Sequence, residues 1–424
     1  MLRSTNALVK ELVEIPGSRR GMLIQIPFQK IDQSGEIFQP LHGLIIALPA
    51  DRTGIPGSII RGMKKNIFLL IVLLTLMVPG LSGCLRSAPE TTSIQPGDDS
   101  MTPGPEKIVE HEVVLISLEG KVAGASSELS GLAWLESGNG NILLLLPQYP
   151  QRFTGGDDGA IFSLQEEEIL AWLDGRNTQP LIPQLVPVYA PGLLDAVQGF
   201  EGFESIAVKD DRIYLTIEAK PGADMMGYVI SGIIAEDLGE IRLDVNTLAE
   251  LKPQANLSNM TDEAIVAAGG SLVTLYEANG ENINPNPVAH RFSLDLQPQP
   301  DLAFPALEYR VTDATSVDKY GRFWVINYFF PEDTKLKPIP DPLAALYGEG
   351  ETHQAQEVVE RLVEFQFTES GIQMVDQPPV YLKLLPDGTA RNWEGLVRLA
   401  DRGFLLVTDK YPETLLGFIE MALP

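Results

Sequence analysis

The run Phe203–Val208 (FESIAV), followed after a short turn by Arg212–Ala219 (RIYLTIEA), sets the pattern that decides the fold. Both runs are rich in apolar and β-branched residues, and the turn between them is polar, which predicts two neighbouring β-strands. Glu204 stands at the start of the first run and Glu218 near the end of the second. In an antiparallel pair these two positions lie at the same end, so the unit is expected to carry two carboxylates there.

The same unit occurs five times. The other four copies, each given as its two runs, are Leu129–Trp134 with Leu145–Gln148, Asp262–Ala267 with Leu275–Ala278, Thr312–Val317 with Val325–Tyr328, and Trp393–Val397 with Val407–Lys410. Successive copies are about 50 to about 80 residues apart, a period that suits four-stranded propeller blades with loop insertions of unequal length. The sequence therefore predicts an all-β fold, a β-propeller of five or six four-stranded blades. A β-sandwich is the alternative.

Three further segments bear on how the ring is completed. Glu112–Leu118 is a strand-like run that could close it, and a sixth blade could lie in Gln165–Gln198 or in Pro331–Gln356. Within the insertion Pro338–Glu364, the stretch Gln354–Leu362 has a helix-compatible pattern. That stretch is expected to form either a lid over the channel mouth or a plain loop.

An export signal precedes the repeats. Met63 is followed by Lys64 and Lys65, then by the apolar run Ile67–Val78, and then by Leu81–Cys84 (LSGC). A basic start, an apolar run and a small-residue cleavage site make a signal peptide, and the run is shorter than the ~20 residues that span a membrane. The tetrad resembles the lipobox of bacterial lipoproteins, which predicts cleavage before Cys84 and a lipid on its thiol.

The remaining chain is divided around this signal. Cys84 is the only cysteine, so it has no partner for a disulfide or a thiolate metal site. Residues 1–62 are interpreted as a mis-annotated start or an unstructured extension, 63–83 as the signal peptide, 84–110 as a flexible Pro- and Ser-rich tether, and 111–424 as the folded domain. A translated extension would instead make the apolar run a signal anchor. The predicted location is the cell envelope, with the domain lipid-anchored on the extracytoplasmic side.

The charge balance limits the partners. Nine of the 31 Lys and Arg residues and five of the 57 Asp and Glu residues precede Cys84, so 22 basic and 52 acidic residues follow, a net charge of −30. Such a surface repels nucleic acid and anionic membranes. We expect a monomer that meets the membrane through its lipid and binds an unknown small molecule or protein, with no nucleic-acid partner.

Two of the repeats carry a family resemblance. Phe200–Ala207 (FEGFESIA) with Arg212–Glu218 (RIYLTIE), and Asn392–Leu396 (NWEGL) with Gly403–Lys410 (GFLLVTDK), are similar to signatures of the phytase-like propeller family, also called the esterase-like activity of phytase domain. The resemblance covers the chain from about residue 127 to residue 419. It implies a propeller fold and an esterase or phosphoesterase activity.

Polar residues at the ends of the repeated strands are the candidate site, because such ends gather around one mouth of a propeller channel. The predicted metal ligands are Glu204, Glu218, Glu263, Glu277, Asp313, Asn327, Glu394 and Asp409, with Gln148 and Lys410 nearby. Oxygen ligands of this kind suit Ca²⁺ or Mg²⁺. Glu204, Glu263 and Glu394 occupy the same place in three repeats and are the predicted catalytic residues. Strand-end carboxylates that only cap turns are the structural alternative.

Other catalytic arrangements have little support. The exported part contains three histidines, His111, His290 and His353, each expected to be an ordinary surface or turn residue, and Gly-x-Ser-x-Gly is absent. Cations for a phosphate-rich substrate are sparse near the repeats. Two functions remain: a divalent-metal-dependent hydrolase of esters or phosphoesters, and a noncatalytic propeller that binds a ligand or partner protein at the cell surface.

Overall fold

The computed structural model describes residues 108–124, 127–138, 140–154, 158–336 and 338–423, and the backbone of two earlier strands. The chain divides into two units, Met1–Ser100 and Met101–Pro424. In the first unit, β1 (Met22–Ile26) pairs antiparallel with β2 (Leu44–Leu48). The signal peptide, Cys84 and the tether up to residue 107 lie outside the described residues, and the predictions about them stay predictions. No helix among the described residues is long and apolar enough to cross a membrane.

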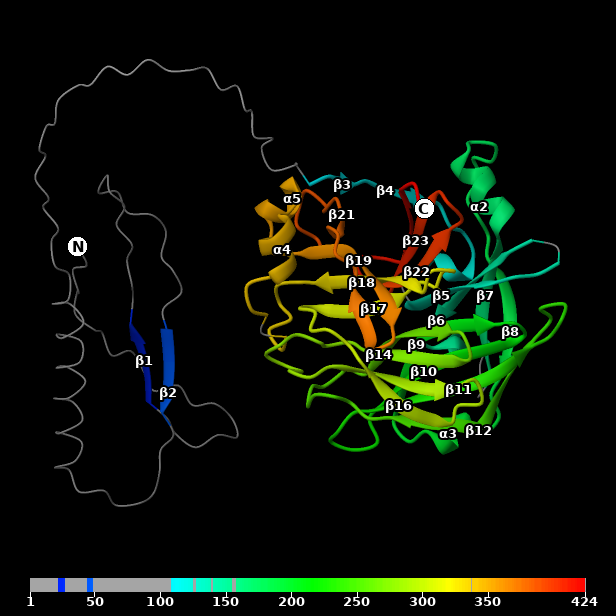
Figure 1. Cartoon of the computed structure of the whole chain (residues 1–424), viewed down its shortest axis with the longest axis horizontal. Helices are drawn as coiled ribbons and strands as arrows, with labels where there is room; N and C mark the ends of the chain where they lie inside the picture. The colour runs from blue at the N-terminus through cyan, green and yellow to red at the C-terminus, as the bar shows by residue number, and fades with distance from the viewer. Residues whose placement is uncertain are drawn as a thin grey trace, which may run out of the picture. The chain divides into compact units, whose positions relative to one another are not determined.

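The second unit is a five-bladed β-propeller (Figure 1). Blade 1 consists of β5 (Leu129–Leu135), β6 (Ile142–Pro147), β7 (Gly159–Gln165) and β8 (Gln184–Tyr189), and blade 2 of β9 (Phe200–Lys209), β10 (Arg212–Ala219), β11 (Met226–Ile234) and β12 (Ile241–Leu251). Blade 3 consists of β13 (Asp262–Ala268), β14 (Ser271–Tyr276), β15 (Val288–Ser293) and β16 (Pro298–Ala303). In these blades each strand pairs antiparallel with the next one along the chain.

The last two blades also take strands from the start of the unit. Blade 4 consists of β17 (Arg310–Ala314), β18 (Arg322–Phe329), β19 (Val359–Thr368) and β21 (Val380–Leu382), with β20 (Gly371–Met374) beside β19 and β3 (Glu110–His111) beside β21. Blade 5 consists of β22 (Trp393–Leu399), β23 (Gly403–Thr408), β24 (Leu416–Glu420) and β4 (Val113–Ile116). The strand predicted within Glu112–Leu118 is confirmed, and it completes blade 5 by pairing with β24.

The five predicted repeats are the two innermost strands of the five blades. Their first strands contact one another in the order β5, β9, β13, β17, β22 and back to β5, so they surround the central axis. Because the second strand of each repeat runs antiparallel to the first, its end returns to the level at which the first strand starts. One end of the channel therefore collects polar residues from all five blades.

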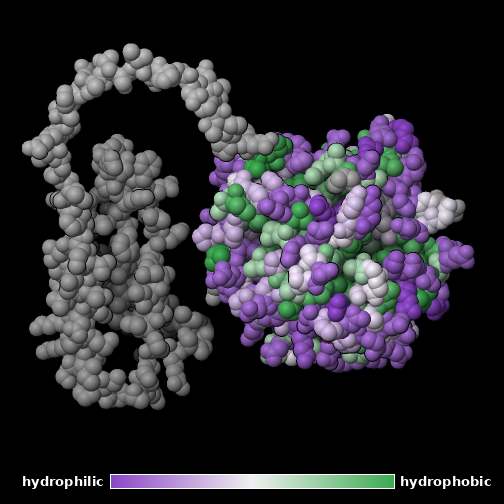
Figure 2. Space-filling view, in the orientation of Figure 1, coloured by the Kyte–Doolittle hydropathy of each residue, from purple (hydrophilic) through white to green (hydrophobic). Residues whose placement is uncertain are grey.

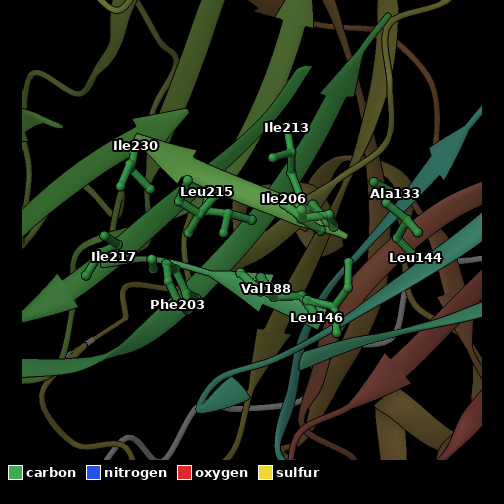
Figure 3. Packing of buried hydrophobic residues seen from close by; sticks show 14 of the residues in the cluster. Ala133, Leu144, Leu146, Val188, Phe203, Ile206, Ile213, Leu215, Ile217 and Ile230 are labelled. Carbon is green, nitrogen blue, oxygen red and sulfur yellow. The ribbon is translucent and has the colours of Figure 1, made fainter. Parts of the chain in front are cut away.

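The core lies between neighbouring blades, because the inner strands are covered on both faces. Figure 3 shows Ile206 of β9 with Ile213 and Leu215 of β10 facing Ala133 and Leu146 of blade 1. All five side chains are buried. At about 25 cal/mol per Å² of apolar area removed from water, such seams supply most of the folding free energy. The outward face in Figure 2 is mainly hydrophilic, in keeping with the acidic composition.

Two sequence predictions are wrong. Neither proposed segment holds a sixth blade: Gln165–Gln198 contains helix α2 (Glu166–Leu173), outer strand β8 and helix α3 (Leu193–Ala196), and Pro331–Gln356 contains only helices α4 (Pro342–Tyr347) and α5 (Glu351–Ala355). The predicted helix over Gln354–Leu362 is also wrong, because helix α5 ends at Ala355 and β19 begins at Val359. Val359 and the residues after it are buried against β18, and this packing overrides their helical pattern. The two remaining short helices are 3-10 turns, Lys121–Ala123 and Pro150–Phe153.

Candidate functional site

The polar mouth holds a pocket of about 690 Å³. Its walls come from the starts of inner strands and from the loops that follow second strands. The lining residues are Gln148, Tyr149, Glu204, Asn259, Glu263, Arg310, Tyr328, Phe330, Pro331, Glu332, Gly388, Thr389, Ala390, Asn392, Glu394, Asp409, Lys410 and Tyr411. The three predicted catalytic residues, Glu204, Glu263 and Glu394, are all among them. A volume of this size is within the range of small-molecule sites.

Arg310, the first residue of β17, lies among the carboxylates. Its Nε donates to Oε1 of Glu277, and its Nη2 lies 3.5 Å from Oε2 of Glu263 and 3.7 Å from Oε1 of Glu394. Its Nη1 donates to Oδ1 of Asn392 at 3.3 Å. Arg310 therefore connects blades 3, 4 and 5 at the floor of the pocket. One guanidinium is shared by three carboxyl groups, so its charge cannot neutralise all of them.

Two amides hold the other carboxyl groups. The Nε2 of Gln148, which directly follows β6, donates to Oε1 of Glu204 at 3.1 Å. The Nδ2 of Asn392 donates to Oε1 of Glu394, two residues further along the chain. Both amides come from positions at the mouth of the channel, so the carboxyl groups are oriented by neutral donors as well as by Arg310. This arrangement fixes the carboxyl groups without removing their ability to take up a proton.

Burial raises the pKa of these carboxyl groups. For Glu263 and Glu394 it holds the pKa well above its usual range; the carboxylates around them, first Glu277 for Glu263 and first Asp409 for Glu394, raise it further, while Arg310 lowers it. For Glu204, burial raises the pKa to about 7, against the hydrogen bond from Gln148. Burial therefore favours the protonated form of Glu263 and Glu394, and at neutral pH Glu204 is divided between its two forms.

Three of the other predicted ligands lie in the pocket lining or directly behind it. Asp409 lines the pocket, and its Oδ1 accepts the backbone N–H of Tyr411 at 2.8 Å. Glu218 and Glu277 lie behind the lining and are almost wholly buried, and each has an Oε2 with no hydrogen-bond partner among the described residues. Burial, and after it the nearby Glu204, raise the pKa of Glu218 to about 9. Glu277 keeps Arg310 as its partner.

Asp313 and Asn327 are part of the frame of the propeller. Oδ2 of Asp313 accepts the backbone N–H of Leu396 at 2.7 Å, which joins blade 4 to blade 5. Asn327 donates to the backbone carbonyls of Glu308 and Arg310 at 2.8 and 3.0 Å, and its Oδ1 accepts from Nε of Arg361 at 2.8 Å. Both side chains are wholly buried and neither lines the pocket.

These contacts bear on the predicted Ca²⁺ or Mg²⁺. Among the described residues, no three His, Cys, Asp or Glu side chains are grouped so as to hold a metal ion. The eight predicted ligands do not fit a single centre, because Asp313 and Asn327 bind backbone groups and Glu277 pairs with Arg310. The metal site stays a prediction, and the chemistry below uses side chains alone.

Sequence reasoning missed several functional positions. Asn392 and four aromatic residues, Tyr149, Tyr328, Phe330 and Tyr411, line the pocket but were not predicted. Tyr149 lies one residue beyond Gln148, Tyr411 two beyond Asp409, and Tyr328 and Phe330 one and three beyond Asn327, so each follows closely after a residue that was predicted for the site.

The histidine prediction is wrong for two of the three residues. His353 is almost wholly buried, and its Nδ1 lies 2.8 Å from Oε1 of Glu110. The Nδ1 of His290 lies 2.8 Å from Oδ2 of Asp262 inside blade 3. Glu110 lies 243 residues from His353 in the sequence, and Asp262 lies 28 residues from His290, so no local sequence pattern predicts either contact. His111 is partly exposed, as His290 also is, and its Nδ1 lies 3.2 Å from the carbonyl of Glu420.

Comparison with known proteins finds only remote structural similarities. No protein-family model matches the chain and no curated protein matches it, so the resemblance to the phytase-like family stays a prediction. Among solved structures, an exo-1,5-alpha-L-arabinanase from a bovine ruminal metagenomic library is 8% identical with a TM-score of 0.40, covering 72% of this chain and 97% of its own. A thermostable family-43 glycoside hydrolase is 10% identical with a TM-score of 0.38, covering 72% and 91%. A mannose phosphorylase from Leishmania mexicana in complex with phosphate ion is 11% identical with a TM-score of 0.38, covering 75% and 90%.

Proposed function

We propose that the folded unit is a hydrolase that uses carboxyl acid–base chemistry on an uncharged, hydroxyl-bearing substrate. One observation carries the proposal: Glu204, Glu263 and Glu394 reach a single pocket of about 690 Å³ from three different blades, and burial raises the pKa of each. Carboxyl groups whose pKa values are raised to different extents can serve as acid and base at the same pH.

The roles follow from the protonation states. Burial favours the protonated form of Glu394 and Glu263, so either is suited to donate a proton to the leaving oxygen of a glycosidic or carboxylic ester bond. Glu204, with a pKa of about 7, accepts a proton from the attacking water in its ionised form. The water oxygen joins the carbon that the leaving group departs from, and the acid and base regain their states by exchange with solvent.

The lining favours an uncharged substrate over a phosphate-rich one. Its only cations among the described residues are Arg310, which is shared by three carboxyl groups, and Lys410, whose Nζ lies 3.6 Å from Oε1 of Glu128. A phosphate ester would need free cations to hold its oxygens. Tyr149, Phe330 and Tyr411 instead offer aromatic faces beside the carboxyl and amide groups, which suits an uncharged ring that carries hydroxyl groups.

A noncatalytic binding role is the second candidate, and the contacts of Arg310 favour it. A guanidinium held at once by Glu263, Glu277 and Glu394 is also what a purely structural ion network would contain. In that case the pocket would bind its ligand through the same amides and aromatic rings. Replacement of Glu394 would then leave binding largely intact and there would be no turnover to lose.

The test is a substrate panel with matched variants. The wild type is assayed with nitrophenyl glycosides, carboxylic esters and phosphate esters, each with Ca²⁺ and with a chelator, alongside Glu204→Gln, Glu263→Gln and Glu394→Gln. We expect glycoside or carboxylic ester turnover that falls ~100-fold or more in Glu204→Gln and Glu394→Gln. Glu332→Gln is the control, because Glu332 lines the same pocket but is exposed.

The possible outcomes distinguish the candidate functions. Turnover that the Gln variants share with the wild type would refute the acid–base assignment. Turnover of phosphate esters alone, abolished by the chelator, would support the metal-dependent phosphoesterase that the family resemblance implies. Calorimetric binding of a sugar without turnover of any substrate class would leave the binding propeller.

We also propose that the chain is held at the extracytoplasmic face of the membrane by a lipid on Cys84. The support is the sequence alone: the basic start, the apolar run and the tetrad Leu81–Cys84. Cys84→Ser removes the thiol that would carry the lipid, so the protein should move from the membrane pellet to the soluble extract. Retention of the Ser variant in the pellet at wild-type level would refute the lipid anchor.

A further inference from the structure

The first residues of the folded unit lie directly against one wall of the pocket. In β3, Glu110 pairs with Tyr381 and His111 with Leu382 in a parallel register, and the N–H of Lys383 donates to the carbonyl of His111 at 2.8 Å. Figure 1 shows β3 beside β21, near helix α5. Strand β21 leads into residues 383–394, here called the pocket wall. Gly388, Thr389, Ala390, Asn392 and Glu394 of this wall line the pocket.

Glu110 is held in place by buried contacts. Its carboxylate accepts the backbone N–H of Thr352 at 3.0 Å and that of His353 at 3.1 Å, and it lies 2.8 Å from Nδ1 of His353. A Cβ on Gly350 would lie 2.1 Å from Cγ of Glu110, so only glycine allows this approach. Three donors around one carboxylate make charge-assisted hydrogen bonds, the stronger kind in proteins.

His353 also contacts Glu360, so it connects Glu110 to that residue. The backbone N–H of Glu360 donates to Nε2 of His353 at 3.2 Å. Because Nε2 accepts, the ring is the neutral tautomer with its proton on Nδ1, where it donates to Glu110. Burial lowers the pKa of His353, although Glu110 opposes this, and the neutral form agrees with both contacts. One imidazole therefore joins β3 to β19.

Glu360 in turn holds the end of the pocket wall. Its carboxylate accepts the backbone N–H of Arg391 at 2.8 Å, Nε of Arg391 at 2.9 Å and Nε1 of Trp393 at 2.8 Å. Arg391 and Trp393 flank Asn392, whose side chain contacts both Arg310 and Glu394. The chain of contacts thus runs without a gap from the start of the folded unit to the proposed acid.

Further bonds hold the middle of the wall from the same side. The N–H of Leu384 donates to Oγ1 of Thr352 at 3.0 Å, and Nε2 of Gln356 donates to the carbonyl of Leu385 at 3.1 Å. Nη2 of Arg391 donates to the carbonyl of Lys383 at 2.7 Å, which ties the two ends of the wall together. Thr352 is the second residue of helix α5, and its backbone N–H is bound by Glu110. The wall therefore depends on the Glu110 contacts at both ends.

We propose that Glu110, His353 and Glu360 are positioning residues that let the N-terminal segment of the folded unit hold the pocket wall, and with it Asn392 and Glu394, in place. The catalytic consequence rests on the proposed hydrolase function, whereas the positioning itself does not. The segment that performs this task begins at Glu110, the last residue of the predicted tether 84–110. A cut or pull that displaces Glu110 would loosen the pocket while leaving the closing strand β4 in blade 5.

The first experiment measures hydrogen exchange of backbone amides in the full chain. The variants are Glu110→Ala, Glu110→Gln, which keeps one acceptor oxygen facing the same amides, and His353→Phe. Glu119→Gln is the matched control, because Glu119 is exposed and lies in the same N-terminal part of the unit. Amides of residues 384–390 report on the wall, and those of β14 in blade 3 are the internal reference.

We expect exchange of the wall amides to accelerate about tenfold or more in Glu110→Ala and His353→Phe, with β14 unchanged, since local opening is set by local contacts. Glu110→Gln should retain most of the protection. If turnover is found, KM should rise several-fold in Glu110→Ala with a smaller change in kcat. Wall amides that stay protected in both variants would overturn the proposal. So would equal acceleration in β14, because it would mean that the whole propeller is weakened; a failed substrate panel would not affect this readout.

Discussion

Replacement of Arg310 tests whether the carboxyl groups at the mouth depend on one shared cation. The change is Arg310→Met, which keeps a side chain of similar length and removes the guanidinium. Its partner Glu277 is wholly buried and has no other donor from a charged side chain among the residues described. Removing the cation therefore leaves a carboxylate in a site where water cannot reach it.

The magnitude follows from these contacts. Breaking a buried ion pair by removing one partner costs about 3–5 kcal/mol, and losing the hydrogen bond to Asn392 costs about 1 kcal/mol. Burial already raises the pKa of Glu277, so without Arg310 this group takes up a proton, which limits the loss. We expect the free energy of unfolding to fall by roughly 3 kcal/mol at pH 8 and by roughly half of that at pH 5.

A double-mutant cycle in urea measures the effect. Arg310→Met, Glu277→Gln and the double variant are unfolded at pH 8, and the interaction energy is taken from the four free energies of unfolding. Because Gln removes the charge that Arg310 compensates, the double variant should be more stable than the sum of the two losses implies, by about 2 kcal/mol. Additive losses, or an Arg310→Met variant that loses less than about 1 kcal/mol, would refute the shared-cation account.

Two further predictions concern stability. Burial raises the pKa of Glu204 to about 7 and that of Glu218 to about 9, so the folded state holds protons that the unfolded chain releases above about pH 4.5. The free energy of unfolding should therefore fall as pH rises from 5 to 9. A urea midpoint that rises over that range would contradict this. Gly395→Ala places a Cβ 2.4 Å from Cγ2 of Val407 and should cost about 1–3 kcal/mol. Gly138→Ala, where a Cβ meets nothing within 4 Å, should cost less than about 1 kcal/mol by the same denaturant measurement, and equal losses would refute the argument.

The repeated unit was sufficient to predict the inner part of the fold. Each of its five copies became the first two strands of a blade, because these strands are buried on both faces and their apolar pattern is strong. The outer strands escaped prediction for the opposite reason. Strand β16 (Pro298–Ala303) is mostly exposed and contains two prolines, which an edge strand tolerates and a central strand does not. Its pairing with β15 is set by position in the blade.

The same unit predicted which carboxyl groups meet but not what each one contacts. Glu394 and Asp313 occupy equivalent places in their repeats, yet Glu394 lines the pocket and Asp313 binds the backbone of Leu396. Asn327 is held by Arg361, which follows the long insertion in blade 4. The partners come from other blades or from insertions, so the spacing of residues along the chain contains no information about them.

Blade 4 differs from the other blades at the mouth of the channel, and this difference affects the chemistry of the pocket. Blades 2, 3 and 5 each place a glutamate at the start of the inner strand, and five such positions bearing acids alone would repel one another until all took up protons. Blade 4 has Asp313 at this place, and three residues earlier, as the first residue of β17, it has Arg310, whose guanidinium lies near Glu263 and Glu394. Its single charge is shared by Glu277, Glu263 and Glu394, so it lowers the pKa of each, while burial and the neighbouring carboxylates raise these pKa values. Carboxyl groups whose pKa values are raised to different extents, Glu204 to about 7 and Glu263 and Glu394 well above their usual range, then lie together in one buried pocket. That coexistence is what a general acid and a general base require of their surroundings.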